Sequence, residues 1–152
     1  MTRKRPDRLP LLERALTGEI IGAFYSCYNE LGFGFLESVY RRALAMELRL
    51  RGIVVAEERT VEVSYRGVSV GMFRMDLVVA GRVIIEVKSA SVLGPTDKRQ
   101  LLNYLRATPI EVGMLLHFGP EPKFYRFADH KSRQAMAAER SPADPAVSAS
   151  SV

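Results

Sequence analysis

The sequence predicts an α/β fold in which a mixed β-sheet is flanked by helices. Two observations predict it. The spacing of apolar residues changes from three and four to two near residue 60, and a strongly apolar segment follows a later helical pattern. The first spacing is typical of amphipathic helices and the second of strands. A meander followed by a helical crossover is economically built as one mixed sheet covered by helices, in the order α-α-β-β-β-α-β.

Two helices are predicted before the sheet. Apolar residues recur at helical spacing over Leu11–Leu31, and the tripeptide Gly32-Phe33-Gly34 then breaks the pattern. A second helix is predicted from about Phe35 to Arg51. Gly52 is its predicted stop, since glycine is favoured just beyond a helix end.

The remaining elements follow from alternation and turn residues. Residues 61–65 alternate apolar and polar side chains, and Gly67 separates them from a second strand, Val68–Val79. Ala80-Gly81 is the next turn. The elements predicted beyond it are a strand over Arg82–Lys88, a helix over Pro95–Ala107, a strand over Glu111–Phe118 and a short edge strand over Lys123–Phe127.

Composition excludes several classes of protein. The chain has 152 residues, of which 47% are hydrophobic, so one packed domain is expected. A single cysteine excludes a disulfide framework and cysteine-built metal sites. Cys27 is expected to be a core thiol and His117 a packed or capping histidine. With only two histidines, a bound metal would need carboxylate ligands.

The net charge of +5 is concentrated at the N-terminus, where four basic residues stand against one acid in the first eight positions. We expect residues 1–9 to be a basic flexible arm, 10–130 a single domain and 131–152 a flexible tail rich in Ser, Ala and Pro. No signal peptide or membrane-spanning run is found. The prediction is a cytoplasmic protein without membrane contact.

Three charged residues lie where a core is expected: Asp76, Glu86 and Lys88. Burying ionised groups is costly unless they are paired or bind a metal. Two carboxylates and a backbone carbonyl, expected from Val87, suit Mg²⁺. Lys88 shares a strand face with Glu86 and would orient water or stabilise charge on a phosphate. The alternative is a structural ion pair on the sheet.

The hairpin register decides whether the two acids can meet. A two-residue turn at Ala80-Gly81 would place Asp76 opposite Ile85 and send Glu86 to the other face. A three-residue loop, Ala80-Gly81-Arg82, with a left-handed residue would pair Asp76 with Glu86, and a bulge could restore the same parity. We predict one of these last two arrangements.

Two further groups flank the acids in the sequence. Gln100 and Tyr104 are four residues apart on the predicted helix and share a face. Gly34, Glu37 and Tyr40 are spaced by three at the start of the second helix. Taken alone, Glu37 could simply complement the helix dipole, and Gln100 could be a surface residue.

The sequence resembles the GxxExxY proteins, small bacterial proteins of the PD-(D/E)xK nuclease superfamily. Gly34-Phe-Leu-Glu37-Ser-Val-Tyr40 matches the naming signature, and Gly71-x-x-Arg74-x-Asp76, Glu86-Val-Lys88 and Gln100-Leu-Leu-Asn103-Tyr104 follow in order. The resemblance covers roughly residues 15–128 and implies a restriction-endonuclease-like core. Met75 stands where the superfamily name has Pro.

The resemblance also implies roles for these residues. Asp76, Glu86 and the helical acid Glu37 are implied metal ligands, and Lys88 is the implied catalytic lysine. Gln100 and Tyr104 resemble an element that braces the site and contacts nucleic acid, and we expect Tyr40 of the signature to bind or brace as well.

The resulting hypothesis is a nuclease that uses Mg²⁺ or Mn²⁺ to hydrolyse phosphodiester bonds, with DNA as the expected substrate. The sequence shows no separate recognition domain, so we expect weak sequence specificity or targeting by a protein partner. The rival is a catalytically silent nucleic-acid-binding or protein-interaction module that keeps the fold.

Overall fold

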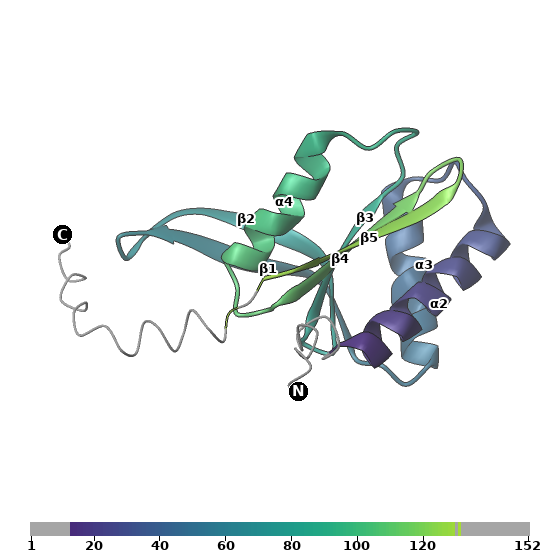
Figure 1. Cartoon of the computed structure of the whole chain (residues 1–152), viewed down its shortest axis with the longest axis horizontal. Helices are drawn as coiled ribbons and strands as arrows, with labels where there is room; N and C mark the ends of the chain where they lie inside the picture. Colours follow the sequence, from purple (N-terminus) through teal and green to yellow (C-terminus); the bar gives the residue numbers. More distant parts are fainter. Residues whose placement is uncertain (1–12, 130, 132–152) are drawn as a thin grey trace, which may run out of the picture.

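Five strands form one mixed sheet in the computed structural model, and helices cover both of its faces (Figure 1). The structure describes residues 13–129 and 131. Its helices are α2 (Arg14–Leu31), α3 (Glu37–Leu50) and α4 (Pro95–Arg106). Its strands are β1 (Val55–Tyr65), β2 (Val68–Val79), β3 (Val83–Lys88), β4 (Val112–Phe118) and β5 (Pro122–Ala128).

The strands lie in chain order across the sheet, β1-β2-β3-β4-β5. The first three are antiparallel, β3 and β4 are parallel, and β5 returns antiparallel to β4. Helix α4 is the crossover that the parallel pair requires. The predicted α/β class and element order are therefore confirmed, and β5 completes the sheet.

Each face of the sheet has its own apolar core. Helices α2 and α3 pack on one face, where Phe24 and Leu44 meet Ile85 and Phe118. On the other face, α4 covers a smaller cluster whose buried members are Met75, Val78, Ile84, Leu101, Tyr104, Leu105 and Leu115. The predicted core thiol Cys27 is buried in the first cluster, and burial raises its pKa to about 11.

The first strand begins earlier than predicted, at Val55 rather than near Val61. Residues 56–60 are exposed and largely polar, so they show no alternation of apolar residues. They are strand because β1 pairs with β2 along almost its whole length. The first helix is described from Arg14, three residues after its predicted start. The remaining boundaries differ by one or two residues: Leu36 caps α3, and Arg82 belongs to the turn before β3.

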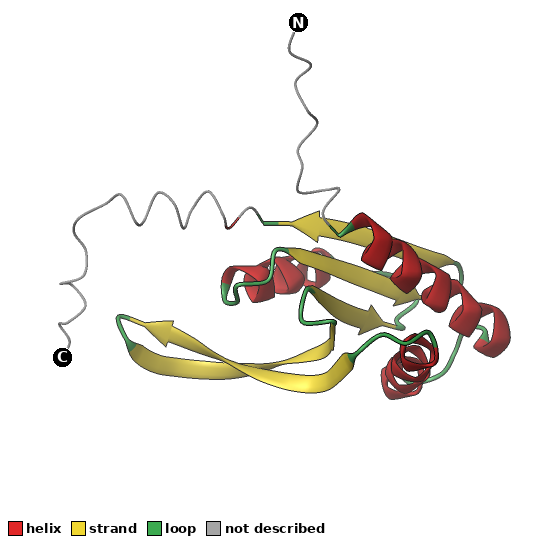
Figure 2. Ribbon diagram, turned by 90° about the horizontal axis from the view of Figure 1, so that it is seen from below, coloured by secondary structure: helices red, strands yellow, loops and turns green. Residues whose placement is uncertain are grey.

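The outer halves of β1 and β2 form a two-stranded ribbon that extends beyond the rest of the sheet (Figure 2). Residues 62–72 at its end are exposed, and they include the apolar residues Tyr65, Val68, Val70 and Met72. Its tip is the Arg66-Gly67 turn, where both residues have positive φ.

The predicted arm, residues 1–9, lies outside the described residues, as does the predicted tail apart from Lys131. In the part of the chain that the structure describes, no helix is both long and apolar enough to cross a membrane.

Tyr40 holds the segment that leads into α3. Its hydroxyl donates to Gly32 O at 2.5 Å and accepts from the Phe35 N–H at 3.2 Å. The ring is fully buried and stacks on Phe118, with centroids 4.3 Å apart. Gly34 lies in this segment with φ of 119°, a conformation that favours glycine. The Gly34 and Tyr40 positions of the signature therefore serve the backbone of the segment.

We expect Tyr40→Phe to lower the free energy of unfolding by about 1–3 kcal/mol, because it leaves two backbone groups without their partner. Urea denaturation measures the change. Tyr65→Phe, at an exposed position on the ribbon, is the matched control and is expected to stay within about 0.5 kcal/mol of wild type. Equal stability of all three proteins would contradict the bracing role.

Candidate active site

A three-residue loop sets the register of β2 and β3. The last ladder pair before the loop is Val79 with Val83, and the Arg82 N–H donates to Val79 O at 2.9 Å. Ala80 and Gly81 have φ of 52° and 67°. The register predicted from the sequence is thus confirmed, and its next step beyond Leu77 and Ile85 places Asp76 opposite Glu86.

Asp76 lies where β2 and β3 separate. The ladder between them ends at Leu77, and the Val87 N–H donates to Asp76 Oδ2 at 2.8 Å. A side chain thus replaces the backbone partner that β2 no longer supplies. Burial raises the pKa of Asp76, while this hydrogen bond and the nearby charge of Lys88 lower it.

Glu86 is the most confined acid of the site. Only 3% of the residue is exposed, and Oε1 is buried without a hydrogen-bond partner. Burial and the neighbouring Asp76 carboxylate raise its pKa to about 8, against the opposing effect of Lys88. Two buried carboxylates side by side repel each other when both are ionised. Both are therefore ionised together only when a cation binds between them.

Lys88 bridges the acid pair and α4. Its Nζ lies 3.8 Å from Glu86 Oε2 and 3.7 Å from Asp97 Oδ1. Asp97 also accepts the Gly94 N–H through Oδ2 at 2.8 Å, which caps the start of α4. One carboxylate therefore fixes both the helix start and the lysine.

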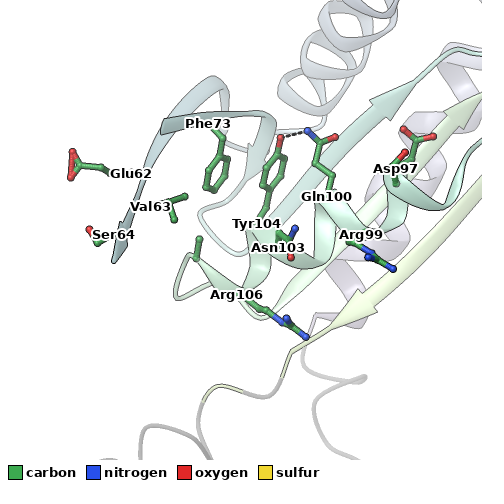
Figure 3. Close-up of a pocket in the computed structure, with 12 residues that line it drawn as sticks. Glu62, Val63, Ser64, Phe73, Asp97, Arg99, Gln100, Asn103, Tyr104 and Arg106 are labelled. Carbon is green, nitrogen blue, oxygen red and sulfur yellow. Dashed lines mark hydrogen bonds between the residues drawn. The ribbon is translucent and has the colours of Figure 1, made fainter. Parts of the chain in front are cut away.

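Tyr104 of the predicted pair on α4 lies close enough to the two acids for their charges to act on it. Gln100 Nε2 donates to Tyr104 Oη at 2.6 Å. Burial, followed by the charges of Glu86 and Asp76, raises the pKa of Tyr104 to about 12. The Tyr104 ring lies flat against Phe73 of β2, with centroids 4.2 Å apart and planes 1° from parallel (Figure 3).

A groove runs beside this aromatic pair, between the ribbon and α4 (Figure 3). Its volume is about 1100 Å³. The ribbon contributes Glu62, Val63, Ser64 and Phe73, and the α4 side is lined by residues that include Asp97, Arg99, Gln100, Asn103, Tyr104 and Arg106. Asp97, which holds Lys88, and Tyr104, whose pKa the two acids raise, both line this groove, so the groove lies next to the candidate site.

The GxxExxY residues are divided between site and scaffold. Glu37 is exposed at the first position of α3 and contributes to raising the pKa of Glu86. Tyr40 is enclosed in the core on the α2 and α3 side, so its hydroxyl serves the chain and does not face the groove.

Sequence reasoning missed three charged residues near the acids. Asp97 follows Gly94-Pro95, a recognisable helix start, but its contact with Lys88 depends on the fold. Arg41 of α3 lowers the pKa of Asp76 and lies 3.5 Å from Glu58. Glu58 stands opposite Asp76 on β1 with φ of 51°, and no pattern in the sequence signals that position.

The donor set fits a hard divalent cation with several waters. Asp76, Glu86 and the backbone carbonyl of Val87 offer oxygen ligands, and the unpartnered Glu86 Oε1 is an oxygen that such an ion would satisfy. Across residues 13–129 and 131, no group of three His, Cys, Asp or Glu side chains is close enough to hold one ion.

Two carboxylates beside a lysine form an arrangement that can act on phosphate esters when a divalent cation is bound. A profile of the PD-(D/E)XK nuclease superfamily matches residues 14–127. The chain belongs to this superfamily, which supports nuclease activity on nucleic acid and whose members generally use divalent metal ions.

Two solved structures resemble the fold. The crystal structure of SSO0001 is 20% identical, with a TM-score of 0.47 over 87% of this chain and 68% of that one. An alkaline exonuclease, LHK-Exo, from Laribacter hongkongensis is 13% identical, with a TM-score of 0.46 over 91% and 77% of the two chains. No curated protein matches the sequence.

We expect the metal-free protein to lose stability as pH rises from about 4.5 to about 8. The pKa of Glu86 is raised from 4.5 to about 8 in the folded protein, so between these values the folded chain holds a proton that the unfolded chain has released. The free energy of unfolding should fall by roughly 2–5 kcal/mol across this window.

Urea denaturation in EDTA at several pH values measures this loss. Glu86→Gln removes the titrating group while keeping the shape, so its stability should change much less over the same window. Glu30→Gln, at an exposed position on α2, should keep the wild-type slope. A Glu86→Gln protein with the full wild-type slope would show that another group is responsible.

Proposed function

We propose that this protein is a Mg²⁺-dependent nuclease that hydrolyses phosphodiester bonds in DNA. The observation that carries the proposal is the buried Glu86, with one oxygen unpartnered, opposite Asp76 and beside Lys88. Membership of the nuclease superfamily supports the same class of reaction.

The chain's own groups divide the work. Asp76, Glu86 and the carbonyl of Val87 would hold the cation, and Glu37 is proposed as the helical acid that acts on it through water. When bound, such a cation lowers the pKa of water and neutralises charge on the phosphate. The Lys88 ammonium, held by Glu86 and Asp97, orients the attacking water and stabilises charge on the phosphate oxygens.

In the reaction, a water oxygen bonds to phosphorus and the ester bond on the opposite side breaks. The attacking water releases a proton to solvent, the departing oxygen takes up one proton from solvent in exchange, and one strand end keeps the phosphate. Helix α4 would position the substrate, because Gln100 and Tyr104 line the groove and are joined by a hydrogen bond. Arg99 and Arg106 give the α4 wall of the groove positive charge that suits a phosphate backbone.

We expect Mg²⁺-dependent cleavage that is abolished by EDTA and lowered about 100-fold or more in Asp76→Asn, Glu86→Gln and Lys88→Ala. Cleavage is measured on single-stranded, duplex and branched DNA and on RNA of the same sequences. Glu30→Gln should retain full activity. Undiminished cleavage by Lys88→Ala would refute the mechanism. Binding without cleavage of any substrate would favour the silent binding module, and preference for RNA would correct the substrate.

We also expect Mg²⁺ to raise the melting temperature, and to raise it more at pH 8 than at pH 6. The ion relieves the repulsion between two buried carboxylates, and a ligand at 100 times its Kd stabilises a protein by about 2.7 kcal/mol. Differential scanning fluorimetry measures the shift. Glu86→Gln should lose most of it and Glu30→Gln none. An equal shift in all three proteins would place the ion elsewhere.

A further inference from the structure

A row of basic side chains crosses the sheet next to the acid pair. Lys88 of β3 is the register partner of His117 on β4, and His117 is the register partner of Lys123 on β5. Register partners on neighbouring strands share a face and are spaced by about 4.8 Å. The three residues therefore form a line from the candidate active site to the β5 edge, on the face that α4 covers.

The outer part of this row opens into a cavity of about 400 Å³. Its walls are the 91–95 segment, Lys98 of α4, and His117, Lys123 and Tyr125 of the sheet. Lys98 Nζ lies 4.1 Å above the Tyr125 ring. Within the described residues neither Lys98 nor Lys123 forms an ion pair, so two cations face the cavity without a carboxylate partner.

His117 contributes an unsatisfied polar atom to the same place. The residue is 5% exposed, its Nε2 lies 2.5 Å from Ala90 O, and its Nδ1 is buried without a partner. Gly119 leaves room for the ring, since a Cβ there would lie 2.6 Å from it. The predicted packed histidine is thus confirmed as packed. Because the Ala90 carbonyl can only accept, Nε2 donates to it, and the buried Nδ1 is left as an acceptor that a lysine ammonium, a water or a protonated phosphate oxygen would satisfy.

Helix α4 begins at the cavity. Gly94 and Pro95, its cap and first residue, are part of the wall, and the positive end of a helix dipole favours anions. The acids nearest in sequence to the two lysines are Asp97, which is engaged by Gly94 and Lys88, and Glu121, which is exposed. The cavity therefore presents two ammonium groups that have no carboxylate partner among the described residues, a polar histidine and a helix start.

We propose that this cavity binds a phosphate group of the substrate, close to the phosphate that is cut. The proposal rests on the proposed nuclease function for the identity of the ligand as nucleic acid. Two strand spacings, about 10 Å, separate the Lys88 and Lys123 positions, which is a few nucleotides at most along a strand. The ligand is either a terminal phosphomonoester or an internal diester of the same strand.

The cavity is tested first with inorganic phosphate in EDTA, where catalysis plays no part. We expect saturable shifts of the His117 imidazole and of the 91–94 amides in NMR spectra of the wild-type protein. The double variant Lys98→Ala, Lys123→Ala should lose them. Arg42→Ala, which removes a positive charge from an exposed position on α3, should keep them. Absence of shifts in the wild type, or equal shifts in the double variant, would overturn the proposal.

Oligonucleotide binding distinguishes the two sources of phosphate. Fluorescence anisotropy with the Asp76→Asn protein compares linear DNA with 5′-phosphate, 3′-phosphate or hydroxyl ends and circular single-stranded DNA. Adding the lysine substitutions should weaken binding about tenfold. Weakening only for one phosphorylated end identifies a terminal phosphate, and equal weakening, circles included, identifies an internal one. Unchanged affinity for every DNA would overturn the proposal.

The two proposals can fail separately. Phosphate shifts without DNA cleavage would leave the anion site standing and refute the nuclease. Cleavage that depends on Lys88, with no phosphate shift, would support the nuclease and refute the anion site.

Discussion

The register of one hairpin decides whether this chain has a site at all. Three residues between Val79 and Val83 make Asp76 and Glu86 cross-strand neighbours, and a two-residue turn would send their carboxylates to opposite faces. The loop can have this length because Ala80 and Gly81 both take positive φ. The positive φ of Ala80, which costs some backbone strain, thus keeps the two acids opposite each other, and the proposed chemistry depends on this arrangement.

Placing two carboxylates opposite each other is unfavourable without a bound cation. Glu86 is buried on the face of the sheet that α4 covers, and its ionised form is opposed by desolvation and by Asp76. Lys88 offsets part of this opposition, but it is shared with Asp97 and lies 3.8 Å away. Buried charged side chains in proteins are usually paired with an opposite charge or bound to a metal ion. The two apolar cores stabilise the fold enough to offset the free-energy cost of burying this one acid pair.

Local pattern predicted most of this fold because the interior strands are dominated by apolar residues. Val83–Lys88 and Val112–Phe118 are buried almost throughout, and charged residues within them stand out. The start of β1 could not be predicted, since residues 56–60 are strand only through pairing with β2. Asp76, Glu86 and Lys88 could be predicted as site candidates because they are charged residues within strands that are otherwise largely apolar.

The rest of the site depends on tertiary placement. Asp97 looks like an ordinary helix-capping residue until α4 is laid over the end of β3, and Arg41 and Glu58 meet only because α3 packs beside β1. His117 was correctly read as a packed histidine, but its alignment with Lys88 and Lys123 is a property of three strands in register. Such relations have no signature within any one segment.

The two walls of the groove, the β1–β2 ribbon and helix α4, differ in stiffness. Helix α4 packs on β4 through buried leucines, whereas the ribbon touches α4 through Phe73, and residues 62–72 beyond that contact are exposed and held mainly by their own cross-strand pairs. Amides in the ribbon should therefore exchange with solvent through local opening well below the global unfolding energy. The groove is therefore rigid along α4, which carries Gln100 and Tyr104. It is more compliant along the ribbon, which could adjust to a bound nucleic-acid strand.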